Sequence, residues 1–146
     1  MKRFSMVTIG LMLAAISAMA APSPGFTNVP AFPGTLANAR FVYVASYDGD
    51  QFAPNLLPED RVAIDTVQNA IQSWGKLSIV YQPGQADMII LVSSRPSEDL
   101  MAVYSVPMRG NFLWRVMGRS GLQANEAPLV TQFEKGFESI SQDNGR

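Results

Sequence analysis

The fold is decided by Met88-Ile89-Ile90-Leu91-Val92 (residues 88–92), the most apolar run of the chain beyond its first twenty residues. A continuous apolar run of this length is typical of a β-strand that is covered on both faces. Pro83 and Gly84 mark a turn shortly before it. The run therefore predicts the central strand of a sheet.

A helical pattern precedes this strand. Between Pro58 and Gly75, apolar residues recur at spacings of three and four and so share one side of a helix: Ala63, Ile64, Val67, Ala70, Ile71 and Trp74. Glu59 and Asp60 place negative charge at the positive end of the helix dipole. Gly75 can adopt the left-handed conformation that ends a helix. We expect Trp74 to be buried, so that Trp74→Ala costs about 3 to 5 kcal/mol.

Four further segments have the composition of strands, rich in β-branched, aromatic or other apolar residues: residues 40–47, 77–81, 100–106 and 112–117. The first of them reads as a strand that is covered on both faces. The last two form a predicted hairpin, because Pro107 and Gly110 lie between them.

A second amphipathic helix begins near Pro128, and its apolar residues share one face: Leu129, Val130, Phe133, Phe137 and Ile140. Gly136 weakens this helix slightly. The element order β-α-β-β-β-β-α predicts an α/β (α+β) domain, in which a single-layer mixed sheet of about five strands carries both helices on one face.

The first twenty residues have the composition of a secretory signal peptide. Lys2 and Arg3 precede an apolar run, and Ala18-Met19-Ala20 supplies the small residues of a cleavage site. The run is shorter than the ~20 residues that span a bilayer, and the chain has no Cys for lipid attachment. We therefore expect residues 1–20 to be cleaved and the mature protein, with no membrane span, to be periplasmic or secreted.

The proline content separates the residues after the signal peptide into a leader and a folded domain. Residues 21–39 contain four prolines, which prevent regular structure, and predict a flexible leader. Residues 40–141 then form a single α/β domain, and 142–146 a disordered tail.

The composition excludes several kinds of chemistry. The 146 residues include no Cys and no His, so a thiolate nucleophile, a Ser-His-Asp triad and an imidazole or thiolate zinc site cannot be built. Loss of Lys2 and Arg3 leaves 9 basic against 12 acidic residues, without the cationic stripe that nucleic acid requires. We expect no catalytic residue, no cofactor, no metal and no nucleic-acid partner.

Carboxylates gather after the first predicted strand, at Asp48, Asp50, Glu59 and Asp60. Calcium prefers several such oxygens, and α/β folds place their sites after strands. However, the spacing lacks the regular ligands of a calcium loop, and Asp-Gly pairs are ordinary turn formers. We interpret Asp48 as a turn residue. A cation-binding protein or a metal-dependent hydrolase that uses the Asp48 loop remains the alternative.

Three other patterns are interpreted as structural. Ser73-Trp74-Gly75-Lys76 matches the S-x-x-K signature of penicillin-recognising enzymes, but it lies at a helix end instead of a helix start. Glu98-Asp99 and Arg119-Ser120-Gly121 are predicted to be solvated surface loops.

Two segments carry a resemblance to known proteins. The passage from Trp74-Gly75 through Ala86-Asp87-Met88, with Leu113-Trp114-Arg115 further on, resembles small exported bacterial proteins of unknown function from acidobacteria-like genomes. More distantly, residues 40–140 are similar to the α/β domains of envelope assembly factors such as the TolB N-terminal domain and the curli secretion factor family. The resemblance brings no catalytic residue. It implies a cell-envelope protein that binds a partner and does not catalyse a reaction. The export signal, the compact domain and the lack of visible chemistry lead us to expect a non-catalytic binding or adaptor module that contacts another envelope protein through its sheet edge or its leader. The oligomeric state stays open.

Overall fold

The computed structural model describes residues 30–106, 110–123 and 127–143. Its sheet has five strands: β1 (Phe41–Ser46), β2 (Ser78–Val80), β3 (Met88–Arg95), β4 (Glu98–Ser105) and β5 (Asn111–Gly118). The helices are α1 (Pro58–Trp74) and α2 (Pro128–Asp143), with short 3-10 turns at Gly34–Leu36 and Pro83–Gln85. The predicted order and fold class are confirmed. Within the described residues, neither helix is long and apolar enough to cross a membrane.

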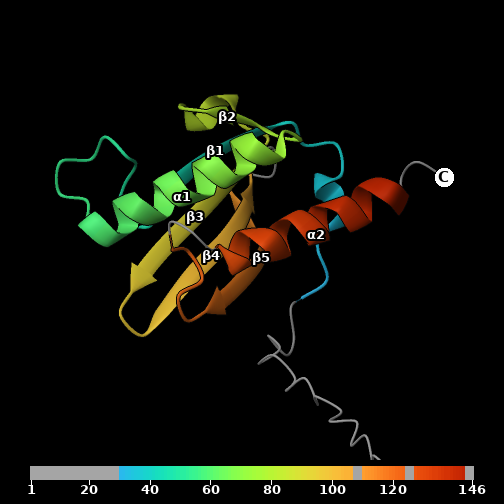
Figure 1. Cartoon of the computed structure of the whole chain (residues 1–146). Coiled ribbons are helices and arrows are strands. Elements are labelled where there is room, and N and C mark those ends of the chain that lie inside the picture. The colour runs from blue at the N-terminus through green and yellow to red at the C-terminus, as the bar shows by residue number, and fades with distance from the viewer. Residues whose placement is uncertain (1–29, 107–109, 124–126, 144–146) are drawn as a thin grey trace, which may run out of the picture.

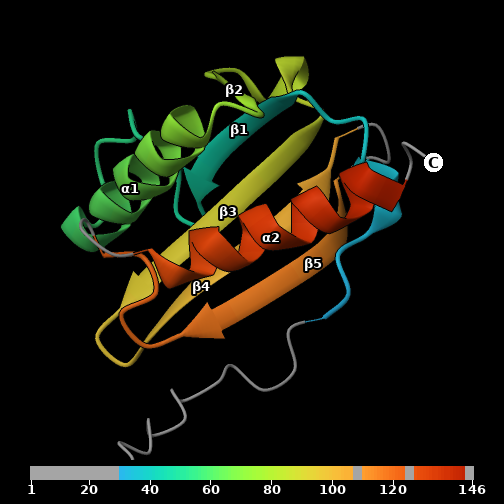
Figure 2. The same cartoon turned by 45° about the vertical axis from the view of Figure 1, so that its right-hand side comes forward.

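The strands lie in the order β2-β1-β3-β4-β5, so the apolar run at 88–92 belongs to the central strand, as predicted. β1 pairs in parallel with both β2 and β3, while β3, β4 and β5 form antiparallel pairs. Both helices pack on the same face of the sheet, and no other described element forms a layer on the opposite face (Figures 1 and 2).

This one-sided packing corrects two predictions about strands. β1 is not covered on both faces. Val42 and Val44 are buried in the core, whereas Phe41 and Tyr47, which alternate with them and so lie on the other side of the sheet, are exposed. The predicted surface loop around Glu98-Asp99 is instead the start of β4, which pairs with β3 through a tight turn that joins Arg95 to Glu98.

The N-terminal boundary of the domain also differs from the prediction. Phe32 packs against Trp114 and Phe133, with ring centroids at 5.2 and 5.3 Å, and Leu36 is buried in the core. The backbone at Pro30 accepts a hydrogen bond of 2.9 Å from the Trp114 indole. A flexible leader over the whole of 21–39 is therefore wrong for residues 32–39.

Other boundaries change little or are not tested. Helix α2 continues to Asp143, two residues beyond the predicted end of the domain. The predicted signal peptide at 1–20, residues 21–29 of the leader and residues 144–146 of the tail lie outside the described residues.

Trp74 is less buried than the sequence predicts, and the largest buried side chain is Trp114 instead. Trp114 is 1% exposed and is the largest fully buried side chain of the described core. Trp74 is only partly buried, and its indole N–H donates to Glu138 Oε1 at 3.0 Å. The helix end after Trp74 is as predicted, because Gly75 has a left-handed φ of 76°.

Gly136 makes room for the N-terminal segment, which is why a glycine is accommodated inside α2. A Cβ atom at this position would lie 2.7 Å from Cδ2 of Phe32. We expect Gly136→Ala to destabilise the protein by about 1 to 2 kcal/mol, because overpacking costs more than the ~1 kcal/mol that alanine gains in helix propensity.

Urea unfolding measures the stability of Gly136→Ala. The control is Lys135→Ala, which changes the exposed neighbouring residue of α2. A Gly136→Ala variant as stable as the native protein would mean that Phe32 does not pack tightly on α2.

Candidate functional site

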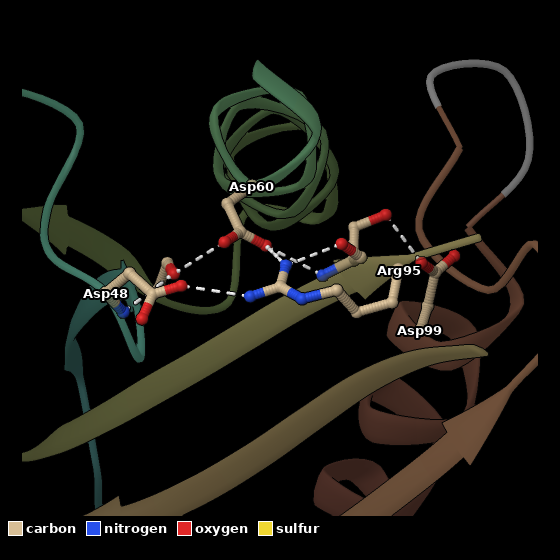
Figure 3. A network of polar contacts seen from close by, with 6 residues as sticks. Asp48, Asp60, Arg95 and Asp99 are labelled. Carbon is tan, nitrogen blue, oxygen red and sulfur yellow. Dashed lines mark hydrogen bonds and ion pairs between the residues drawn. The ribbon is translucent and has the colours of Figure 1, made fainter. Parts of the chain in front are cut away.

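A network of polar side chains gathers at one end of the sheet, where β1, α1, β3 and β4 meet (Figure 3). Asp48 follows the end of β1, and Asp60 lies in the first turn of α1. Arg95 ends β3, and Asp99 is the second residue of β4. The segments around Asp48 and Arg95, far apart in the sequence, therefore converge.

Asp60 is the centre of this network and has no exposed surface. Its Oδ1 accepts hydrogen bonds from the Ser94 backbone N–H at 2.8 Å and from Arg95 Nη1 at 2.9 Å. Its Oδ2 accepts a third from the Ser46 hydroxyl at 3.1 Å. A single carboxylate thus ties the start of α1 to the ends of β1 and β3.

Arg95 joins two carboxylates across the network. Its Nη2 donates to Asp48 Oδ2 at 2.9 Å, while Nη1 reaches Asp60 and the carbonyl oxygen of Ser94. The hydrogen bond to Asp60 is the main reason why the pKa of Arg95 is raised. The guanidinium therefore compensates the charge of buried Asp60.

Asp99 is the second buried carboxylate, and the sequence interpretation of this residue is wrong. It is 3% exposed. Its Oδ1 accepts from the Ser94 hydroxyl at 2.6 Å, and its Oδ2 from the Leu122 N–H at 3.0 Å. The alternation of Asp99 with buried Met101 and Val103 along β4 was the signal that could have placed it on the helix side.

The remaining predicted carboxylates do not join this network. Asp50 binds its own loop, accepting from the Phe52 N–H at 2.9 Å and the Tyr43 hydroxyl at 3.3 Å. Burial, followed by the charge of Asp50, raises the pKa of Tyr43. Glu59 lines a shallow pocket of about 370 Å³ beside the start of α1.

These contacts give the carboxylates a structural role. Every oxygen of Asp60 and Asp99 already accepts a hydrogen bond from the protein. Among the described residues, no three Asp, Glu, His or Cys side chains come together to hold a metal ion. A cation site on the Asp48 loop therefore finds no support in this part of the chain.

The other sequence patterns are also accounted for structurally. Lys76 of the S-x-x-K match pairs with Glu138 at 2.8 Å, and its hydrogen bond is the main cause that lowers the pKa of Glu138. Ser120 adopts a left-handed turn conformation with φ of 51°. Lys76, the basic residue of the match, is thus bound to Glu138 and not to Ser73.

The uncovered face of the sheet carries a second candidate site that the sequence interpretation missed. The register places Tyr43, Ile89, Tyr104 and Phe112 in one row across β1, β3, β4 and β5. The next row holds Ala45, Leu91, Ala102 and Arg115. We call these two rows, together with Phe41 and Tyr47, the aromatic face.

Two tyrosines cross the aromatic face. The hydroxyls of Tyr47 and Tyr104 lie 3.2 Å apart and share a hydrogen bond. Burial, then this hydrogen bond, raises the pKa of Tyr47 to about 12. Ala45 and Ala102 lie in the second row of this face and are nevertheless buried, so larger neighbouring side chains cover these small residues.

The outer edge of β5 is a third candidate functional site. β5 is eight residues long and, within the described residues, pairs with β4 alone. The opposite edge strand, β2, has only three residues. Natural sheets usually shorten or block such edges, because unpaired N–H and C=O groups can accept a further strand.

Comparisons with known proteins give no family. No protein-family model and no curated protein sequence match the chain. Among solved structures, the chain is similar to the PelC dodecamer from Paraburkholderia phytofirmans, with 16% identity and a TM-score of 0.40, over 79% of this chain and 91% of that chain. A TM-score this low does not establish a common fold, and the resemblance to exported bacterial proteins and TolB stays a prediction.

Proposed function

We propose that this protein is an exported, non-catalytic adaptor module of the cell envelope, which holds an extended segment of another envelope protein against the outer edge of β5. The observation that carries the proposal is the long outer edge of β5, which pairs with no strand among the described residues. Full occupation of the buried carboxylates by structural partners supports a binding role over a catalytic one.

The backbone groups available at this edge follow from the hydrogen-bond alternation. The Val106 N–H donates to the carbonyl of Asp87, so the even-numbered residues along β4 bond to β3. The backbone N–H and C=O groups of the odd-numbered residues of β4 then point to β5, where Met101 pairs with Val116 and Asp99 with Gly118. The N–H groups of Arg115 and Met117 consequently point to the outer edge.

The chemistry of this edge favours an extended peptide. Strand addition uses main-chain hydrogen bonds for affinity and alternate side chains for specificity. Exposed Arg115 and the nearby Arg119 make the edge locally positive, and β5 itself carries no acidic residue. A partner segment with acidic residues at alternate positions fits best.

Proline at position 117 tests the proposal, since proline is tolerated at an edge position whose N–H faces outward but cannot donate to an added strand. We expect immobilised native protein and Met117→Ala to retain the same saturable partner from envelope extracts, and Met117→Pro to lose it. Circular dichroism checks that Met117→Pro is folded. Equal retention by Met117→Pro, or no saturable partner at all, would rule out strand addition at β5.

A further inference from the structure

We infer that two copies of this chain pack through their aromatic faces, around a twofold axis that runs about parallel to β3. Arg115 of each copy then pairs with Asp50 of the other copy. This goes beyond the proposed function, because it uses the side chains on the face of the sheet and leaves the backbone edge of β5 open.

The first argument is the composition of the aromatic face. Phe41, Tyr47 and Phe112 are 45%, 48% and 55% exposed. Leu100 and Met117, which pair across β4 and β5, add a further row on the same side of the sheet. Apolar side chains therefore extend over four strands, on the side that neither helix covers (Figure 2). A contiguous exposed apolar surface of this kind marks an interface with another protein.

The second argument is the area of this face. β3, β4 and β5 have eight residues each, and β1 has six. At ~4.8 Å between strands and ~3.4 Å per residue, these strands present a face of roughly 500 Å² in projection. The relief of the side chains makes the accessible area larger than the projection. A standard interface takes about 600 to 1,000 Å² of accessible area from each partner, so the whole face has the size that a dimer needs.

The third argument is the position of Asp50. The loop after β1 turns back along this strand, where Gly49 forms an antiparallel bridge with Ser46. The same antiparallel pairing, continued by one residue, brings Asp50 beside Ala45 and onto the side of the aromatic face. The hydrogen bond of 3.3 Å from the Tyr43 hydroxyl to Asp50 Oδ2 supports this position, because Tyr43 belongs to that face. Asp50 therefore lies at the β1 border of the aromatic face.

The fourth argument is charge complementarity between two copies. Arg115 lies at the β5 border, in the row that also holds Ala45 and Leu91. Leu91 is on the central strand, and Asp50 and Arg115 are each two strand spacings, about 9.6 Å, to either side of it. A twofold axis parallel to β3 consequently places each carboxylate opposite the guanidinium of the other copy. Within the described residues neither group forms an ion pair, so both are available to the second copy.

The geometry of packed sheets agrees with this arrangement. Two sheets that pack face to face keep their strands within about 30° of each other and lie ~10 Å apart, a gap that an arginine side chain can span. The hydroxyls of Tyr47 and Tyr104 already share a hydrogen bond of 3.2 Å, which lowers the cost of removing them from water.

Sedimentation equilibrium of the purified protein tests the use of the aromatic face. We expect the native protein to form a dimer, and Phe112→Ser to be monomeric at the same concentrations, because it places a polar residue in an apolar row. Phe52→Ala is the matched control, since Phe52 is 71% exposed but belongs to the loop between β1 and α1. It should remain dimeric. Circular dichroism checks that each variant is folded.

Mixing two charge variants tests the pairing of Arg115 with Asp50. Arg115→Asp brings like charges together at both ends of the row, and so does Asp50→Arg, so we expect each variant alone to be monomeric. In an equimolar mixture, the new aspartate of one variant faces the new arginine of the other, and the native charges of the two variants also match. The mixture should therefore form a heterodimer.

The inference fails if the native protein is monomeric, if Phe112→Ser dimerises like Phe52→Ala, or if the mixture of charge variants stays monomeric. If Asp50→Arg does not fold, Arg115→Asp alone decides the pairing, and a dimer of this variant overturns it. Immobilised Phe112→Ser should still retain the partner of the β5 edge. A failure of the dimer is thus distinguishable from a failure of strand addition.

Discussion

Asp60→Ala should destabilise the protein by about 3 to 5 kcal/mol, the usual cost of removing one member of a buried, hydrogen-bonded charge pair. The substitution leaves the Ser46 hydroxyl and the Ser94 N–H without their acceptor inside the protein. It also separates the start of α1 from the ends of β1 and β3. Since small domains have only ~5 to 15 kcal/mol of stability, this variant should be close to unfolding at room temperature.

Asp48→Ala is the matched control for this prediction. Asp48 binds the same Arg95, but the two side chains are 53% and 40% exposed. Exposed ion pairs contribute about 0 to 1 kcal/mol, so Asp48→Ala should have a small effect. Urea unfolding of both variants, followed by circular dichroism, compares them directly.

Asp60→Asn separates the carboxylate charge from the hydrogen bonds. An amide oxygen can still accept from the Ser94 N–H, so we expect Asp60→Asn to lie between the native protein and Asp60→Ala. Equal stability of Asp60→Ala and Asp48→Ala would show that the network does not hold α1 in place. A bound cation at this loop would give the reverse order, with Asp48→Ala the more harmful.

Trp114→Ala is the second large effect, and we expect it to cost about 3 to 5 kcal/mol. The indole lies between the sheet and α2, with ring centroids 5.2 Å from Phe32 and 6.4 Å from Phe133. Its removal leaves a cavity in the centre of the core and removes the hydrogen bond to Pro30. The N-terminal segment should therefore detach together with the loss of core packing.

Trp74→Ala provides the comparison, and the structure lowers the cost expected for it from the sequence, because Trp74 is not fully buried. Trp74 is partly exposed at the end of α1, so part of its side chain is solvated before truncation. We expect Trp74→Ala to be milder than Trp114→Ala by at least ~1 kcal/mol. Urea unfolding followed by far-UV circular dichroism avoids the change in fluorescence. If Trp74→Ala were the more damaging, the description of the core around Trp114 would be wrong.

The regular elements could be predicted from the sequence, because each one repeats a local pattern. Spacings of three and four between apolar residues identify the side of α1 that faces the sheet, and the run at 88–92 identifies the central strand. The left-handed glycine after α1 also follows from a local rule, because a residue without a Cβ atom adopts this conformation without strain.

The candidate sites depended on the tertiary structure. Asp60 and Asp99 have the polarity of surface residues, and only their donors at Ser46, Ser94 and Leu122 make burial favourable. Except for the Ser94 hydroxyl, which is five residues from Asp99, these donors come from segments that are distant in sequence from the carboxylates that they bind. The aromatic face could not be predicted for a similar reason. The two helices could have covered either side of the sheet, and their packing decides which aromatic side chains remain exposed.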